Sequence, residues 1–219
     1  MLDASPATRY GQRLPRRLIQ LYAGLLLYGI SMALIIRSAL GNMPWDVLHQ
    51  GLADRLDRSI GTVAIAVGAL VLLAWIPLRQ RPGLGTVSNV VVLGLALDAT
   101  LAVVPAPSSL PLRVGLLVAG VLLNGVATAA YIGVHLGPGP RDGLMTGLVR
   151  RTGRSVRLVR TTIEVAVVAC GWLLGGTLGL GTVLYAVAIG PLVQTLLPRL
   201  SVGPAVSPAP PAGAPAPPV

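Results

Sequence analysis

The sequence predicts an all-α, polytopic membrane helix bundle with about six transmembrane helices, arranged as two inverted three-span repeats with short amphipathic or re-entrant helices. The chain is 53% apolar and only 11% charged, whereas soluble domains carry about 25% charged residues. Residues 17–98 and 113–194 also align without a gap at an offset of 96, with 29 identities in 82 positions. Because each copy contains an odd number of predicted spans, the second copy enters the membrane upside down, as in many secondary transporters.

Apolar stretches of the length that crosses a bilayer, about 17–25 residues, define the elements. They lie at residues 18–37, 60–78, 85–104, 114–134, 158–176 and 180–198. The first stretch is too long for the apolar region of a signal peptide, so we expect an uncleaved span. The predicted organisation is a flexible cytoplasmic arm (1–16), membrane repeat 1 (17–104), a connector (105–112), membrane repeat 2 (113–198) and a disordered Pro/Ala-rich tail (199–219).

The arginines predict the orientation. All 17 basic residues are arginine, and with a cytoplasmic N-terminus 13 of the 17 fall on the cytoplasmic side. This excess follows the positive-inside rule, so we expect a multi-pass protein with cytoplasmic N- and C-termini. The arginines lie in short loops rather than on one helix face, so no nucleic-acid partner is expected.

A repeated motif follows the first span of each copy. LGNMPWDVLHQGL returns as LGPGPRDGLMTGL. Pro44 and Pro140 suit the first turn of a helix, and Asp46 and Asp142 then lie where a carboxylate favours the helix dipole. A helix of about 14 residues is about 21 Å long, too short to span, so it is interfacial or re-entrant. The expected structural glycines of the repeats are Gly41, Gly137, Gly83, Gly85, Gly179 and Gly181.

Asp46 and Asp142 are the first candidate substrate-binding residues. If both motif helices dip toward the midplane, their carboxylates would bind a cation or carry a proton. The alternative is that each aspartate only orients an interfacial helix, which is worth about 0.3–1 kcal/mol.

Arg157, Arg160 and Glu164 are the second candidate group, and they occur in the second copy alone. Their spacing places them near one helix face. Glu164 is expected inside the hydrocarbon core, where an unpaired carboxylate is costly, with Arg160 as its partner. A charged cavity that recognises an anion and a purely structural ion pair both stay open as interpretations.

The remaining polar residues predict neither a metal site nor a cofactor. His49 and His135 are expected at the interface, without the spacing of metal ligands. Asn124 is expected to form hydrogen bonds between helices. Asp98 is expected at a hydrated surface.

The motifs resemble those of the YitT/YczE family of small bacterial integral membrane proteins. The similarity covers about residues 17–198, and LGPGPRDGLMTGL is its most specific part. The resemblance implies a multi-span protein of the bacterial cytoplasmic (inner) membrane. It implies no defined activity and no catalytic residue.

Two functions follow from these features. The first is a small secondary transporter or permease for an unknown small molecule or ion, motivated by the repeat and the intramembrane charges. The alternative is a non-transporting scaffold or accessory subunit, favoured by the weak site chemistry and the proline-rich tail. An enzyme is not expected, because no Ser/His, Cys/His or paired aspartate motif occurs. The expected partners are the lipid bilayer and either a second copy of the chain or another membrane protein.

Overall fold

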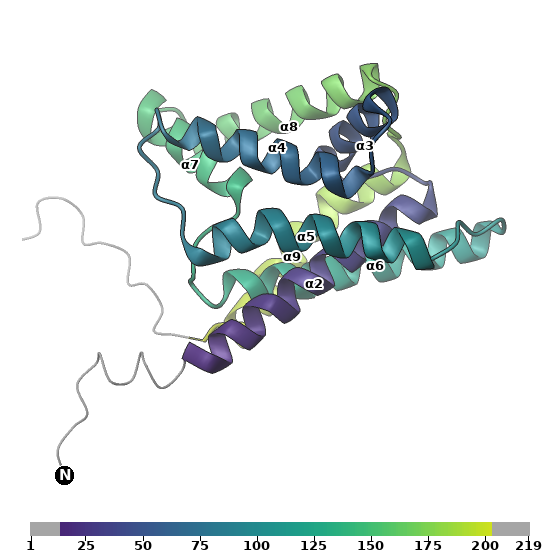
Figure 1. Ribbon diagram of the computed structural model, residues 1–219, viewed down its shortest axis with the longest axis horizontal. Helices are drawn as coiled ribbons and strands as arrows, with labels where there is room; N and C mark the ends of the chain where they lie inside the picture. Colours follow the sequence, from purple (N-terminus) through teal and green to yellow (C-terminus); the bar gives the residue numbers. More distant parts are fainter. Residues whose placement is uncertain (1–13, 203–219) are drawn as a thin grey trace, which may run out of the picture.

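A computed structural model describes residues 14–202, which form eight helices and no strand (Figure 1). The helices are α2 (Leu14–Ser38), α3 (Pro44–Leu56), α4 (Ile60–Trp75), α5 (Leu84–Val103), α6 (Leu110–Ile132), α7 (Pro140–Thr152), α8 (Val156–Leu173) and α9 (Leu180–Leu200). This confirms the all-helical class. The helices extend slightly beyond the predicted 17–198, and most of the predicted arm and tail lie outside the described residues.

Local sequence signals explain where the short helices and their successors begin. Proline occupies the first turn of both α3 and α7, as the motifs predicted. Ser59 caps α4 by accepting a hydrogen bond from the backbone N–H of Thr62, and Ser155 caps α8 in the same way with Leu158. The four helices of the second half start 96 residues after those of the first.

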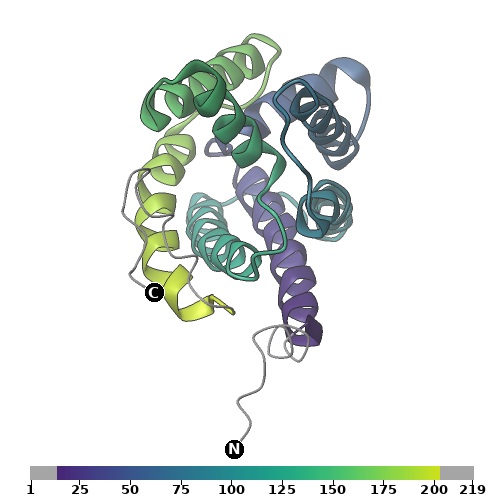
Figure 2. The same cartoon turned by 90° about the vertical axis from the view of Figure 1, so that its left-hand side faces the viewer.

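The two central helices, α2 and α6, run antiparallel. Arg17, near the start of α2, donates to the carbonyl of Val134 just after α6, at 2.7 and 2.9 Å. Arg113, near the start of α6, donates to the carbonyls of Ser38 and Ala39 at the end of α2, at 2.7 and 2.6 Å. Each arginine thus satisfies carbonyls that the end of the other helix leaves open. Figure 2 shows α5 on one side of this pair and α9 on the other.

The motif of each half forms backbone hydrogen bonds with the other half. The amide of Gly85, at the start of α5, donates to the carbonyl of Leu136 at 2.8 Å. The amide of Gly181, at the start of α9, donates to the carbonyl of Leu40, also at 2.8 Å. The two bonds are related by the same offset of 96 residues as the two copies of the sequence.

Glycine is required where the motif of one half contacts the other half. Gly41 has φ +121° and Gly137 has φ +123°, values that residues with a side chain rarely adopt. A Cβ on Gly41 would also lie 2.8 Å from the amide nitrogen of Gly179, and one on Gly137 would lie 3.0 Å from Cα of Gly83. Both the backbone conformation and the close approach of the other half therefore favour glycine at Gly41 and Gly137.

Small residues let the long helices approach closely. A Cβ on Gly29 of α2 would lie 2.6 Å from the Cβ of Ala96 on α5. A Cβ on Gly120 of α6 would lie 2.7 Å from Ile35. Such contacts bring helix backbones together where no hydrophobic force from water acts between them.

Four helices, α2, α5, α6 and α9, are long and apolar enough to cross a bilayer. A fifth crossing results if α3 and α4, which meet at 113°, form one broken span. The predicted spans at 60–78 and 158–176 coincide with α4 and α8, which have 16 and 18 residues. Both are shorter than the about 20 residues of a typical span, and α8 also contains three charges, so the count of six stays a prediction.

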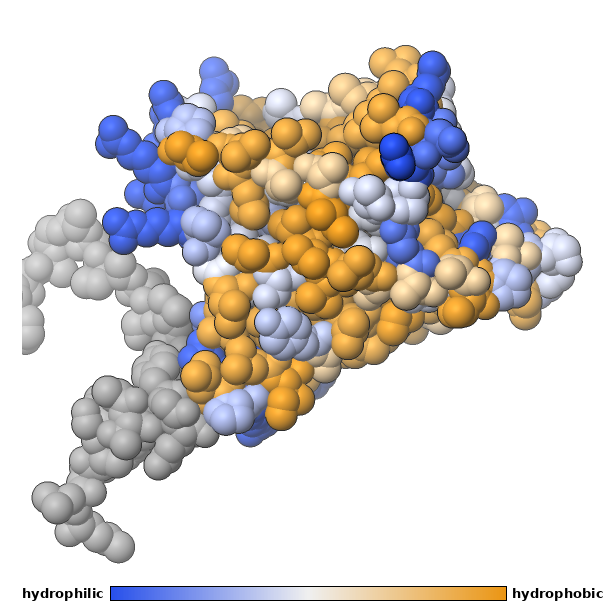
Figure 3. Space-filling model, viewed as in Figure 1, coloured by the Kyte–Doolittle hydropathy of each residue, from blue (hydrophilic) through white to orange (hydrophobic). Residues whose placement is uncertain are grey.

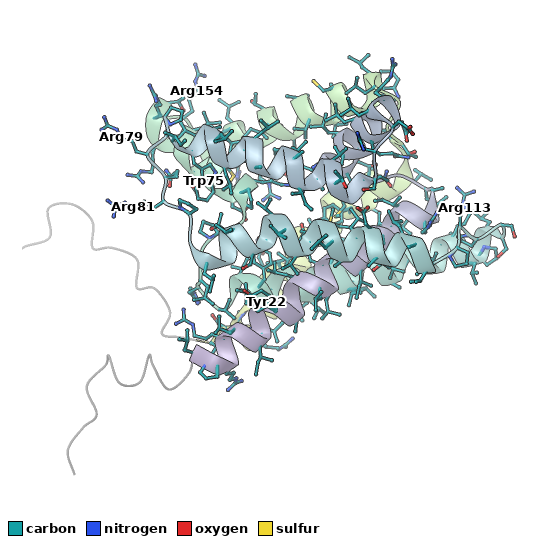
Figure 4. The ribbon with its side chains drawn as sticks, in the orientation of Figure 1. Tyr22, Trp75, Arg79, Arg81, Arg113 and Arg154 are labelled. Carbon is teal, nitrogen blue, oxygen red and sulfur yellow. The ribbon has the colours of Figure 1, made fainter. Side chains whose placement is uncertain are left out.

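The surface has the pattern of a protein that lies within a membrane. Apolar residues cover most of the face seen in Figure 3, and hydrophilic residues gather at its two ends. Arg79, Arg81 and Arg154 lie at the end where α2 begins, and Arg113 lies at the opposite end (Figure 4).

The two halves differ most in the contact between their third and fourth helices. In the first half α4 packs along α5, and a Cβ on Gly94 would lie 2.5 Å from Ile65 Cγ1. In the second half the equivalent helices, α8 and α9, hardly touch, and a Cβ on Gly190 would meet no atom within 4 Å. The α4–α5 contact is closed, whereas the α8–α9 contact is open.

Candidate functional site

A cavity of about 360 Å³ lies between the two halves and is lined by residues of all eight helices. The first turns of α3 and α7 border it, together with one face each of α4, α5, α6, α8 and α9. Its ionisable and aromatic lining residues are Tyr28, Trp45, His49, Tyr131, Arg141, Asp142, Arg160, Glu164 and Tyr185. The candidate residues Asp142, Arg160 and Glu164 line this cavity, whereas Asp46 and Arg157 are not among its lining residues.

An ion pair between the halves lies beside this cavity, with Arg141 in the lining and Asp46 behind it. Asp46 of α3 is completely buried, and its Oδ1 lies 3.1 Å from His49 Nδ1 and 3.9 Å from an Nη of Arg141 on α7. The Arg141 guanidinium also lies 4.8 Å from the centre of the Trp45 ring, a cation–π distance. The Arg141 side chain is 30% exposed, so the pair is only partly buried, and it links the two motif helices.

Asp142 lies next to Arg141 in sequence but has a different environment. Its Oδ2 accepts a hydrogen bond from the hydroxyl of Tyr131 at 3.3 Å. Burial raises the pKa of Asp142 above its ordinary value of 3.8, although the Tyr131 hydrogen bond and the charges of Arg141 and Arg160 act in the opposite direction. The short helix α7 therefore presents a carboxyl group to the cavity that holds its proton more tightly than an exposed aspartate.

Arg160 and Glu164 face the cavity from α8. Arg160 Nε lies 2.9 Å from Glu164 Oε1, which confirms the predicted pair. The side chain of Glu164 is 38% exposed, and that of Arg160 is 58% exposed. Arg157 is exposed one turn earlier and does not line the cavity. Its repeat-mate Gly61 packs against α5, consistent with the different packing of the two halves.

Tyrosines form a part of the cavity that sequence reasoning missed. The rings of Tyr28 and Tyr131 are 6.0 Å apart and nearly perpendicular. The Tyr185 hydroxyl donates to Asn124 Oδ1 at 2.9 Å, and Asn124 Nδ2 donates to Ser31 Oγ at 2.8 Å. The latter contact confirms the predicted hydrogen bonding between helices. A tyrosine hydroxyl inside an apolar span needs a polar partner, and this signal in the sequence would have pointed to the cavity.

His49 differs from expectation, and Asp98 has a capping role. His49 is buried against Asp46 rather than interfacial, because α3 is tucked between α4 and α8. Asp98 accepts hydrogen bonds from Ser59 Oγ at 2.6 Å and from the Gly61 amide at 2.8 Å, so it caps the start of α4. Within residues 14–202 no group of three or more His, Cys, Asp or Glu side chains is placed to hold a metal ion.

The long apolar helices, the apolar surface and the closely packed glycines define an integral membrane protein. The chain belongs to a family of unknown function, DUF6198, whose sequence profile matches residues 15–198. An uncharacterized protein of Haemophilus influenzae is 44% identical to it over 173 residues, 79% of each chain. The uncharacterized membrane protein YczE of Bacillus subtilis is 32% identical over 180 residues, 81% of this chain and 84% of YczE. The similarity to YczE agrees with the predicted resemblance. No solved structure matches the chain.

Proposed function

We propose that the protein is a small secondary transporter of the bacterial cytoplasmic membrane rather than an enzyme. The observation that carries the proposal is the cavity between the halves, which is bordered by the first turns of one short helix from each half. Transporters built from inverted repeats place their substrate site at the repeat interface, where the N-termini of broken helices point at the ligand. His49 of α3 and Arg141 and Asp142 of α7 line this cavity. Asp46 of α3 pairs with Arg141 from behind the lining.

The unequal packing of the halves supports alternating access. The interface of α4 with α5 is closed around Gly68 and Gly94, whereas the equivalent interface of α8 with α9 is open. Since the halves share one fold, exchanging the two packings produces a second conformation in which α4 and α5 separate. Rocking of one repeat against the other around a fixed site is the motion that such transporters use.

The proposal includes the orientation of the protein in the membrane. The arginines at the end where α2 begins include Arg79, Arg81 and Arg154 (Figure 4). Following the positive-inside rule, this end is cytoplasmic, as is the end of α9, whose Leu200 carbonyl accepts from Gln20 near the start of α2 at 2.6 Å.

Disulfide trapping tests the alternation without knowledge of the substrate. All variants carry Cys170→Ser, which removes the chain's own thiol. The Cβ expected at position 68 lies 3.6 Å from the Cβ of Val90, within the usual disulfide range of about 3.5–4.5 Å. Gly68→Cys with Val90→Cys is therefore expected to cross-link α4 to α5 at once in lipid nanodiscs.

The second pair reports the alternate conformation. Thr161→Cys with Gly190→Cys occupies the repeat-equivalents of Ile65 and Gly94, which are in contact. We expect this pair to cross-link α8 to α9 more slowly, as the minor conformation is visited. Thr161→Cys with Gly115→Cys on α6 is the control for random collision, because alternation does not bring these helices together. If the α8–α9 pair reacts no faster than this control at any pH, the helices do not exchange, and the scaffold or accessory role replaces transport.

A further inference from the structure

We infer that the cavity takes a monovalent organic cation, which binds in exchange for the proton of Asp142; this inference rests on the proposed transport function. The charges of the cavity wall carry the argument. Arg141 faces Asp46 at 3.9 Å, and Arg160 faces Glu164 at 2.9 Å. Asp46 lies behind the lining as the partner of Arg141, and Glu164 and Asp142 are the carboxyl groups of the lining itself. Within residues 14–202 Asp142 has no salt bridge.

These pairs determine the net charge of the side chains around the cavity. With each arginine paired to a carboxylate, the wall is neutral while Asp142 holds its proton and carries one negative charge after Asp142 loses it. An uncompensated charge in a low-dielectric cavity is costly. When Asp142 is ionised, one positive charge from a ligand neutralises the site, so the ligand is a monovalent cation.

The shape of the wall favours an organic cation over a metal ion. Trp45, Tyr28, Tyr131 and Tyr185 contribute aromatic rings to the cavity. Aromatic faces attract cations, most strongly when the site is desolvated, and the Arg141 guanidinium already lies 4.8 Å from the Trp45 ring centre. A volume of about 360 Å³ is in the range of pockets for small organic ligands.

The surroundings of Asp142 allow its proton to exchange. Burial raises the pKa of its carboxyl group, while Tyr131, Arg141 and Arg160 oppose this shift. The other titratable groups that face the cavity are Tyr28 on α2, His49 on α3, Glu164 on α8 and Tyr185 on α9, and the lining residues of α4 and α5 are not ionisable. On binding, the cation takes the place beside the carboxylate and the proton passes to water, so one positive charge enters and one leaves.

The test measures binding of benzyltrimethylammonium to the purified full-length protein by calorimetry between pH 5 and 8. This cation has no proton of its own, so repeating the titration in buffers with different ionisation heats counts the protons that the protein releases. We expect one proton released per cation at pH values below the pKa of Asp142. In this pH range, the Kd for the cation falls about tenfold for each unit of pH increase.

Asp142→Asn is expected to abolish proton release and to weaken binding at least tenfold, whereas Asp54→Asn, on the exposed end of α3, leaves both unchanged. Thermal unfolding shows whether each variant is folded. Tyr131→Phe provides a second variant, because losing the hydroxyl that bonds to Asp142 raises the pKa of that carboxyl group. Its binding curve should therefore move to higher pH.

Three results would overturn this inference. One is cation binding without proton release, or binding that Asp142→Asn does not weaken. Another is binding of benzenesulfonate instead of the cation, which would make the ligand an anion and leave the proposed transport intact. The third is that neither probe binds; the disulfide-trapping experiment then decides separately whether the protein alternates between two conformations.

Discussion

Gly94 and Gly190 occupy equivalent positions in the two halves, and comparing their alanine variants measures how unequally the halves are packed. In Gly94→Ala the new methyl group lies 2.5 Å from Ile65 Cγ1 and 2.7 Å from the carbonyl oxygen of Gly61. In Gly190→Ala it meets no atom within 4 Å. Overfilling a packed interface costs about 1–3 kcal/mol, whereas replacing glycine by alanine within a helix stabilises it by about 0.5–1 kcal/mol.

The helix-propensity gain is common to both variants, so it cancels in their difference. We expect Gly190→Ala to be the more stable by about 1–3 kcal/mol. For a chain of 219 residues, this corresponds to a difference in Tm of about 2–12 °C.

Thermal unfolding in detergent, followed by tryptophan fluorescence, measures this difference directly. The unsubstituted protein should unfold at or below the Tm of Gly190→Ala. Equal losses of stability in both variants would refute the reasoning, because α8 and α9 would then be packed as closely as α4 and α5.

Two further experiments test the orientation and the environment of Asp142. In a Cys170→Ser background, an impermeant maleimide should label Asp54→Cys in intact cells and its repeat-mate Arg150→Cys only after lysis; labelling of both from one side would contradict the inverted arrangement. Burial raises the folded-state pKa of Asp142 above 3.8, so the folded protein binds the proton of this carboxyl group more tightly than the unfolded chain does. The free energy of unfolding therefore declines as pH rises from the unfolded-state pKa to the folded-state pKa of Asp142. Asp142→Asn lacks this decline, so its Tm relative to the unsubstituted protein should increase with pH and then level off. A difference in Tm that does not change with pH would show that the pKa of Asp142 is the same in the folded and the unfolded protein.

The sequence predicted the helices well because their signals are local. Pro44 and Pro140 marked the first turns of α3 and α7, and Ser59 and Ser155 precede α4 and α8. A capping serine or a proline acts on the first turn that follows it, so its effect can be predicted without knowledge of the fold. Arg160 and Glu164, four residues apart on one helix, were predicted to pair for the same reason.

The cavity could be predicted only in part, because it depends on contacts between the halves. Asp46 and Asp142 were both candidates, yet their different environments follow from Arg141, which reaches across to Asp46 rather than binding its own neighbour. His49 was misplaced because its burial results from the packing of α3 between α4 and α8. Tyr131 was overlooked because its apolar ring fits a span, whereas its role depends on where the hydroxyl points.

The reciprocal hydrogen bonds between the halves have a consequence for biogenesis. During synthesis, the first half enters the membrane before its partners exist. At this stage the Leu40 carbonyl has not yet paired with the Gly181 amide, and the Gly85 amide has not yet paired with the Leu136 carbonyl. Backbone groups left unpaired in lipid cost several kcal/mol each, so the nascent first half is an unfinished intermediate until nearly the whole helical region has been translated. A premature stop codon in the connector therefore yields a fragment without a stable fold. During synthesis the first half stays unfinished from the end of α5 at Val103 until Gly181 has been added.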